Sequence, residues 1–284
     1  MFMIRHIAQK YLPPILTEGL RSLKKQKNLW ANRRLLAKNQ EIEGSFAGED
    51  CFILASGPSI ARQDLTALKD CRCISVNNFF VHPDFKTVKP VFHCIAPYHP
   101  PISENTWRNW MFDLKNHLDH HTSVVFGVKD FKRSDEYFKD FKRYYLSFDA
   151  SVNYIDKNGV NLTGALLSPY SVTVQAIQLA LGSGFARIFL LGFDHDGILH
   201  HGKSSHFYNE EKDVKVRDGY SEWDKSMVKD IGTQFEALAE LWKQYRLLKK
   251  VAERRGVKII NLTEGGLLDV FERGNFLETH IVKR

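Results

Sequence analysis

The sequence predicts an α/β protein built on a doubly wound, mostly parallel sheet. Short apolar runs alternate with longer segments of helical spacing, and this alternation is typical of parallel strands joined by crossover helices. Nearly every apolar run also ends in a polar or glycine-containing motif, at the position where ligands bind in such sheets. The chain has 284 residues, 43% of them hydrophobic and 26% charged, so it is long enough to bury a full core.

Six of the apolar runs are predicted as strands, because each is short and bounded by turn-forming residues. The fifth run is the most apolar of the chain and is preceded by Gly182 and Gly184. The predicted strands are residues 51–55, 73–76, 90–95, 123–128, 187–192 and 257–261.

Segments with helical spacing lie before and between these runs. Pro13 and Pro14 interrupt the start of the chain, so a long first helix is predicted to begin just after them. Gly256 follows the longest stretch of helical spacing and is expected to end that helix. The predicted helices are residues 15–39, 60–69, 171–181, 225–255 and 266–271.

A polar, glycine-containing break at residues 44–50 divides the chain into two parts. Residues 1–43 are expected to form a basic, amphipathic, helical arm, and residues 44–284 a single domain. Within that domain, about residues 195–224 are polar and lack a clear period. A segment of this length is often a lid over a binding site, and we predict one here.

Positive charge is concentrated in the arm. Residues 1–38 contain nine Lys or Arg and one acidic side chain, whereas the rest of the chain contains 31 basic and 32 acidic ones. Basic residues interleaved with bulky apolar ones suit an anionic membrane surface, so residues 1–40 are predicted to dock on such a surface or on a partner. The alternative is a helix packed on its own domain or on a second subunit. No nucleic-acid partner is expected, because the body has no excess charge to neutralise phosphates.

The sequence also indicates a compartment. It contains no run of the roughly 18–20 apolar residues that a membrane-spanning helix needs, and no secretory leader. Its four cysteines form no CxxC pair and no zinc-type spacing. We therefore predict a reducing, cytoplasmic location, with at most peripheral attachment to the inner face of the cytoplasmic membrane.

The turn after the first predicted strand is a candidate anion site. Ser56, Gly57, Pro58 and Ser59 combine a glycine turn, a proline suited to the start of a helix, and two hydroxyl groups. Neither a GxGxxG nor a GK[ST] pattern is present. The motif therefore indicates either a phosphate site or an ordinary tight turn.

Two more polar motifs follow predicted strands. Asn77 and Asn78 offer donors and acceptors for a ribose or a pyrimidine, although adjacent asparagines also form turns readily. Asp194 and Asp196 have the DxD spacing with which many glycosyltransferases hold a divalent metal and a sugar diphosphate. The same carboxylates can bond hydroxyl groups or cap the following loop, so a divalent metal is one of two open alternatives.

The predicted lid is rich in histidine. His201 and His206 are candidate general bases, because imidazole can exchange a proton near neutral pH. Lys203, Tyr208 and Tyr220 lie in the same segment and can clamp a departing phosphate. The alternatives are a metal cluster, although no known zinc pattern fits, and a polar surface loop with incidental histidines. The sequence contains no GxSxG motif, so a hydrolase with that type of nucleophile turn is not expected.

Taken in order, these motifs resemble those of bacterial lipo-oligosaccharide sialyltransferases and of a related family that includes hydroxymethylpterin pyrophosphokinase-like proteins and flagellar glycosylation factors. The resemblance covers about residues 49–275 as scattered short motifs. They are FILASGPSI at 52–60, the asparagine pair, the helix at 171–182 with RIFLLGFD at 187–194, and KIINLT at 258–263.

The resemblance implies a Rossmann-like nucleotide-binding domain that binds a CMP-activated acidic sugar and needs no obligatory metal. It implies a lid histidine as general base, matched here by His206 or His201; we choose His206 because Phe and Tyr208 follow it directly. Ser171 falls where the sialyltransferases have a Thr-Ser-Gly run, replaced here by Pro-Tyr-Ser. The candidate donor-binding set is Ser56, Gly57, Pro58, Ser59, Asn77, Asn78, Ser171, Asp194, Lys203, Tyr208 and Tyr220.

The expected function is an inverting glycosyltransferase of surface-polysaccharide assembly, such as lipopolysaccharide or capsule. It would transfer a sialic- or Kdo-type sugar from CMP to a hydroxyl of a glycan or a lipid-linked acceptor. One alternative is a Mg²⁺-dependent pyrophosphokinase with Asp194 and Asp196 as metal ligands. The other is a non-catalytic nucleotide-binding relative.

Overall fold

A computed structural model describes residues 14–100, 102–200, 206–208, 213 and 230–279. These residues form a Rossmann-like α/β fold, as predicted, around one nine-stranded sheet in the order β6-β5-β4-β3-β2-β1-β7-β8-β9. All neighbouring strands pair in parallel. The strands are β1 Asp50–Leu54, β2 Cys73–Val76, β3 Phe92–Cys94, β4 Ser123–Gly127, β5 Arg143–Ala150, β6 Ala165–Leu167, β7 Arg187–Leu191, β8 Lys258–Asn261 and β9 Glu272–Arg273.

The strand order places a topological switch between β1 and β7. From β1 the chain adds strands in one direction as far as β6, and then returns to place β7 on the other side of β1. The two strands pair over their full length, from Asp50 with Arg187 to Leu54 with Leu191. In such sheets a crevice opens where the two directions part, beyond the carboxyl ends of the strands.

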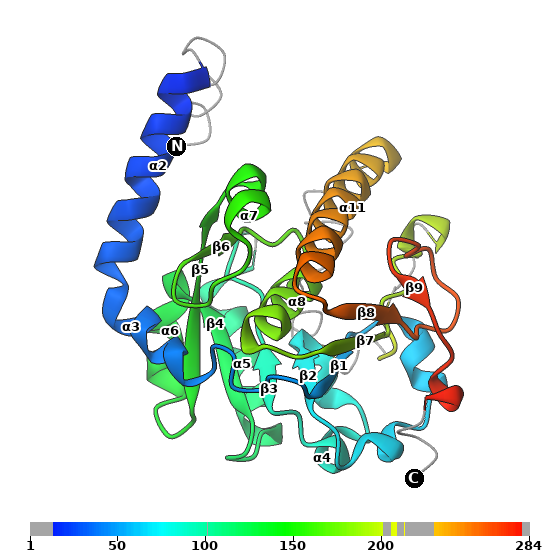
Figure 1. The fold of residues 1–284 in the computed structure, drawn as a ribbon. Coiled ribbons are helices and arrows are strands. Elements are labelled where there is room, and N and C mark those ends of the chain that lie inside the picture. The colour runs from blue at the N-terminus through cyan, green and yellow to red at the C-terminus, as the bar shows by residue number, and fades with distance from the viewer. Residues whose placement is uncertain (1–13, 101, 201–205, 209–212, 214–229, 280–284) are drawn as a thin grey trace.

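Helices cover both faces of the sheet (Figure 1). One apolar cluster is formed with α7, α8 and α11, and the other with α4 and α5. Every residue of α8 from Thr173 to Ser183 is buried, so this helix is the most enclosed one that the structure describes. The helices are α2 Pro14–Ala31, α3 Arg33–Ala37, α4 Phe85–Val88, α5 Glu104–His117, α6 Phe131–Tyr137, α7 Val152–Asn158, α8 Val172–Ser183 and α11 Ile231–Arg254.

In the described part of the arm, residues 14–43, the helix predicted at 15–39 is divided into α2, α3 and a short 3₁₀ helix, Lys38–Glu41. It breaks at Asn32 between α2 and α3, and α2 extends away from the sheet in Figure 1. After α3, the fully buried Asn39 donates hydrogen bonds to the carbonyls of Tyr145 and Leu162, at 2.8 and 2.7 Å. These bonds anchor the end of the arm to the domain. No helix in the described part of the chain is both long and apolar enough to cross a bilayer.

Two other predicted helices are wrong. The segment at 60–69 consists of two short 3₁₀ helices, Pro58–Arg62 and Leu65–Leu68, because the chain is extended at Gln63 and Asp64. Residues 266–271 are irregular, since Gly265 and Gly266 both have positive φ and so leave the helical region.

Buried histidines are expected to make stability depend on pH. His93 in β3 is fully buried against the Ser75 hydroxyl, and burial lowers its pKa from 6.5 to about 3. Below pH 6.5 the imidazole of His93 therefore binds a proton in the unfolded chain but stays neutral in the folded protein. For this group, the free energy of unfolding falls by about 1.4 kcal/mol for each unit by which the pH is lowered. Chemical denaturation of wild type and His93→Gln between pH 7 and pH 5 measures it. The variant should show a slope shallower by about one proton, and equal slopes would contradict this.

Candidate functional site

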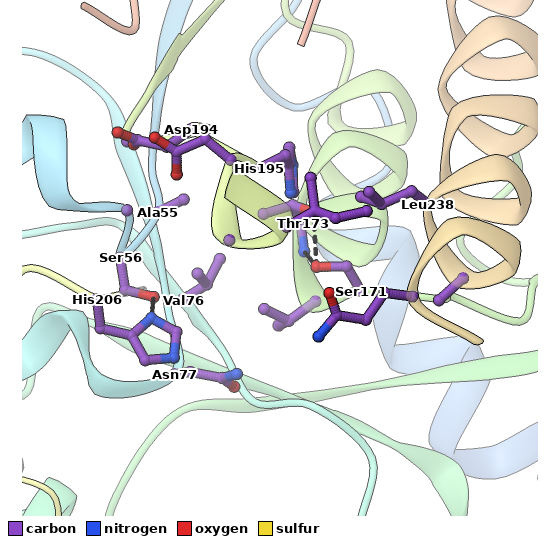
Figure 2. A pocket seen from close by; sticks show the side chains of 18 residues that line it. Ala55, Ser56, Val76, Asn77, Ser171, Thr173, Asp194, His195, His206 and Leu238 are labelled. Atoms are coloured by element: carbon purple, nitrogen blue, oxygen red, sulfur yellow. Dashed lines mark hydrogen bonds between the residues drawn. The ribbon is translucent and has the colours of Figure 1, made fainter. Parts of the chain in front are cut away.

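A cavity of about 390 Å³ lies at the switch point between β1 and β7 (Figure 2). Its walls come from the carboxyl ends of β1, β2 and β7, the first turn of α8, and the first two turns of α11. The side chains with polar groups in its lining are Ser56, Asn77, Ser171, Thr173, Asp194, His195, Asp196, His206 and Gln234. Five of the predicted site residues, Ser56, Gly57, Asn77, Ser171 and Asp194, therefore meet here with His206, although they are far apart in the sequence.

The carboxylate of Asp194 lies at the turn of residues 56–59, where we predicted a phosphate. It accepts hydrogen bonds from the backbone N–H and the hydroxyl of Ser59, at 3.0 and 2.7 Å. Burial raises the pKa of Asp194, the two bonds from Ser59 lower it, and the charge of Asp196 raises it further. Ser59 is fully buried, and neither Ser59 nor Pro58 lines the cavity. The protein's own carboxylate thus takes the place of an anion at this turn.

Glycines make this close approach possible. A Cβ on Gly57 would lie 1.9 Å from Oδ2 of Asp194 and 2.5 Å from the carbonyl oxygen of Gly192. Gly266 has a φ of +71°, and a Cβ there would lie 2.6 Å from the carbonyl oxygen of Asp194. The segments that contain Gly57 and Gly266 therefore pack against the side chain and the backbone of Asp194, respectively, without room for a Cβ.

The N-terminus of α8 offers the cavity an anion-binding end. Ser171 is the N-cap of this twelve-residue helix, and its hydroxyl accepts from the backbone N–H of Thr173. Ser171, Val172 and Thr173 all line the cavity. The partial positive charge of a helix N-terminus favours a phosphate or a carboxylate. The structure therefore moves the candidate phosphate site from the Ser59 turn to α8.

The two neighbouring asparagines have different surroundings. Asn77 lines the cavity with a strained φ of +45°, and its side-chain oxygen accepts from the backbone N–H of Ala96 at 3.0 Å. This bond fixes the amide of Asn77, and strain of this kind is common at functional sites. Asn78 is instead buried in the core, where it accepts a hydrogen bond from the indole N–H of Trp110 at 2.5 Å. Of the two asparagines, only Asn77 is placed to contact a ligand in the cavity.

The short segment His206–Tyr208 docks beside the end of β1. The backbone N–H of Phe207 donates to the carbonyl of Ser56 at 3.0 Å, and Nδ1 of His206 lies 3.3 Å from the Ser56 hydroxyl oxygen. His206 lines the cavity, as Figure 2 shows. Tyr208 stacks on His206 but is buried beside a second cavity of about 240 Å³, which differs from its predicted contact with the donor. His201, Lys203 and Tyr220 lie outside the described residues.

His195, Thr173 and Tyr245 were not among the predicted site residues. Nε2 of His195 lies 2.8 Å from the Tyr245 hydroxyl, which lies 2.6 Å from the Thr173 hydroxyl. His195 has a φ of +49°, and burial lowers its pKa to about 4, so the ring is neutral at pH 7. The sequence signal for His195 is its position between Asp194 and Asp196, but the spacing of these two carboxylates is more typical of a metal site.

The described part of the chain contains no assembled set of ligands for a divalent metal. Both carboxylate oxygens of Asp194 accept hydrogen bonds from Ser59, and Asp194 and Asp196 are the only carboxylates among the described residues that line the cavity. Among these residues no group of three His, Cys, Asp or Glu side chains converges. The residues described here therefore do not fit a DxD-type metal site, and we assign no chemistry to one.

No protein-family model matches the sequence, and no curated protein matches it. Among solved structures, the sialyltransferase CstII from Campylobacter jejuni in complex with cytidine-5'-monophosphate is similar at 15% identity, over 80% of this chain and 85% of that one, with a TM-score of 0.45. The sialyltransferase Cst-I from the same organism matches at 16% identity over 79% of each chain, with a TM-score of 0.46.

A third solved structure is the MAf glycosyltransferase from Magnetospirillum magneticum AMB-1. It matches at 14% identity over 85% of this chain and 37% of that one, with a TM-score of 0.49. With identities this low and TM-scores below 0.5, the function of this chain has to come from the chemistry of its own site.

Proposed function

We propose that this protein is a glycosyltransferase that moves an acidic sugar from a CMP-activated donor to a hydroxyl of a glycan or glycolipid. One observation carries the proposal. The N-terminus of α8 and the imidazole of His206 line the same cavity, at the switch point of a doubly wound sheet. An anion site and a proton acceptor in one cavity are what transfer from a sugar phosphate to a hydroxyl requires. The motif resemblance adds CMP as the nucleotide.

The donor would lie across the cavity from α8 to the end of β2. Its phosphate would sit at the first turn of α8, where Ser171 supplies a hydroxyl group beside the helix N-terminus. The fixed amide of Asn77 would donate to the cytidine or its ribose. One phosphate needs one such site, which suits a nucleoside monophosphate as leaving group.

The chemistry would be a single displacement. His206 takes the proton of the acceptor hydroxyl as the acceptor oxygen forms its bond to the anomeric carbon. The bond from that carbon to the phosphate oxygen breaks, and CMP leaves with the electron pair, stabilised at the α8 N-terminus. Attack opposite the leaving group inverts the anomeric carbon.

The pyrophosphokinase alternative has less support from the described residues. It needs a Mg²⁺ ion for a polyphosphate, and the Asp194 carboxylate that would hold the ion is bonded to Ser59. A non-catalytic relative would share the cavity and the phosphate site but show no turnover with donor and acceptor present.

A thermal-shift screen with CMP, CDP, UDP and ATP, each with and without Mg²⁺, tests the proposed ligand. We expect CMP to raise the melting temperature without metal, because a ligand that binds only the folded state stabilises it by mass action. Stabilisation by ATP with Mg²⁺ alone would contradict the proposal and support the pyrophosphokinase. If none of the four nucleotides raises the melting temperature, the proposal that the cavity binds a nucleotide is wrong.

We further propose that the arm docks the enzyme on an anionic membrane surface. Leu23 and Trp30 are 64% and 68% exposed and lie seven residues apart on α2, on the same side of the helix. Lys24 and Lys27 are exposed on the same helix, and the Arg33 guanidinium lies 4.4 Å from the centre of the Trp30 ring. Exposed apolar side chains among cations suit the interface of an anionic bilayer.

Vesicle sedimentation tests this docking. The variant Leu23→Gln/Trp30→Gln should bind vesicles of phosphatidylcholine and phosphatidylglycerol several-fold more weakly than wild type, and pure phosphatidylcholine should bind neither. Phe112→Gln is the matched control, since Phe112 on α5 is 62% exposed outside the arm. Unchanged binding would overturn the proposal. Loss of self-association in place of vesicle binding would identify the arm as a subunit contact.

A further inference from the structure

Four side chains are joined by a chain of hydrogen bonds along one wall of the cavity, from the loop after β7 through α11 to the start of α8. The bonds join Nε2 of His195 to the hydroxyl of Tyr245 at 2.8 Å, and that hydroxyl to Thr173 at 2.6 Å. The Thr173 hydroxyl then donates to the hydroxyl oxygen of Ser171 at 2.8 Å. His195, Thr173 and Ser171 line the cavity, whereas Tyr245 is fully buried behind them.

The direction of these hydrogen bonds is fixed once one is known. Because Thr173 gives its only hydroxyl proton to Ser171, its oxygen must accept the proton of Tyr245. The Tyr245 oxygen must then accept from a protonated Nε2 of His195. In a neutral imidazole this leaves Nδ1 without a proton.

The other end of the chain is Ser171. Its hydroxyl oxygen accepts from the hydroxyl of Thr173 and, at 3.4 Å, from the Thr173 backbone N–H. With both acceptor positions used inside the protein, the Ser171 hydroxyl proton is left for a ligand, because Ser171 lines the cavity. The neighbouring Gln244 holds the segment before α8 through bonds with Ser168 and Tyr170, both at 2.8 Å. Two successive side chains of α11, Gln244 and Tyr245, thus both hold the start of α8 in position.

We infer that His195 and Tyr245 are positioning residues that orient the Ser171 hydroxyl as a hydrogen-bond donor to a phosphate oxygen of the ligand. The inference rests on the proposed function for the identity of that ligand as CMP. It assigns a role to a histidine that lines the cavity without taking part in proton transfer. An orientation set in advance favours a ligand oxygen that only accepts, as an ionised phosphate does.

The tautomer of His195 tests the chain without any ligand. Long-range ¹H–¹⁵N correlation spectra of protein labelled at its 12 histidines resolve which ring nitrogen carries the proton, and the spectrum of His195→Gln assigns the signal. We expect a protonated Nε2 and a bare Nδ1 at pH 7. A proton on Nδ1 would overturn the inference, because Tyr245 would then donate to His195 and the Ser171 proton would point inward.

Calorimetric titration of Tyr245→Phe tests the consequence for binding. This variant removes one hydroxyl and should weaken CMP and inorganic phosphate by about twofold to tenfold while leaving cytidine unchanged. Tyr145→Phe is the matched control, since Tyr145 is also buried and bonded to a serine hydroxyl, Ser134, but lies outside the cavity lining. Equal effects on CMP and cytidine, or none, would overturn the inference.

The same titrations separate this inference from the proposed function. If wild type binds inorganic phosphate but not CMP, the nucleotide assignment fails, and Tyr245→Phe must still weaken phosphate for the inference to hold. If wild type binds neither CMP nor phosphate, both are overturned.

Discussion

Replacing His206 with alanine should lower turnover by about 10²- to 10⁴-fold, the range for removal of a general base. His206 lines the cavity opposite the α8 N-terminus, and its Nδ1 lies 3.3 Å from the Ser56 hydroxyl oxygen, so the ring is held at the site. CMP affinity should change little, because the proposed base acts on the acceptor. The measurement is the rate of CMP release from a CMP-activated sialic acid, with and without a glycan acceptor.

His121→Ala is the control for this variant, since His121 is exposed and lies outside the cavity lining. Full activity of both variants would place the base elsewhere. A His206→Ala enzyme that keeps its turnover but loses CMP affinity would make His206 a binding residue, contrary to the role proposed for it.

Gly57→Ala should destabilise the protein by about 3 kcal/mol or more and abolish CMP binding. The added Cβ would lie 1.9 Å from the Asp194 carboxylate and 2.5 Å from the backbone oxygen of Gly192, which accepts a hydrogen bond from the Gly57 N–H. Overpacking costs about 1–3 kcal/mol, and each buried partner that loses its bond to Asp194 costs about 1–3 kcal/mol more. A fall in melting temperature of about 6 °C or more is therefore expected by calorimetry.

Gly19→Ala gives the matched comparison. Gly19 lies within α2, and a Cβ there would meet nothing within 4 Å. Alanine should be neutral or stabilise this helix by up to about 1 kcal/mol. If Gly57→Ala melts at the same temperature as Gly19→Ala, the close packing of Gly57 against the Asp194 carboxylate does not determine the cavity wall as we describe.

The central part of the fold could be predicted from the sequence. Strands β1, β2 and β7 are buried on both faces, so each is a continuous apolar run. The outlying strands give weaker signals: β5 mixes polar and apolar residues, and β9 has two exposed residues. Helix α5 was missed although its signal is present, with Ser103 as N-cap and buried Trp107, Trp110, Met111 and Leu114 at helical spacing.

The site was predictable at its strand ends but not in its contacts. Ser56, Asn77 and His206 were found because polar residues follow apolar strands or stand out in a histidine-rich segment. The bonds between Asp194 and Ser59 join residues 135 positions apart, and nothing local to either residue indicates them. Whether Ser59 meets a ligand or a carboxylate depends on how β7 sits beside β1, which is a property of the folded sheet.

A crystal structure of the protein with CMP tests the assignment of the cavity most directly. We expect the phosphate within hydrogen-bond distance of Ser171 and the first turn of α8, and the cytidine toward Asn77, with His206 on the side where the sugar would lie. We also expect the Asp194 carboxylate to stay bonded to Ser59. A phosphate bound at Ser59 in place of Asp194, or CMP bound outside this cavity, would contradict the assignment.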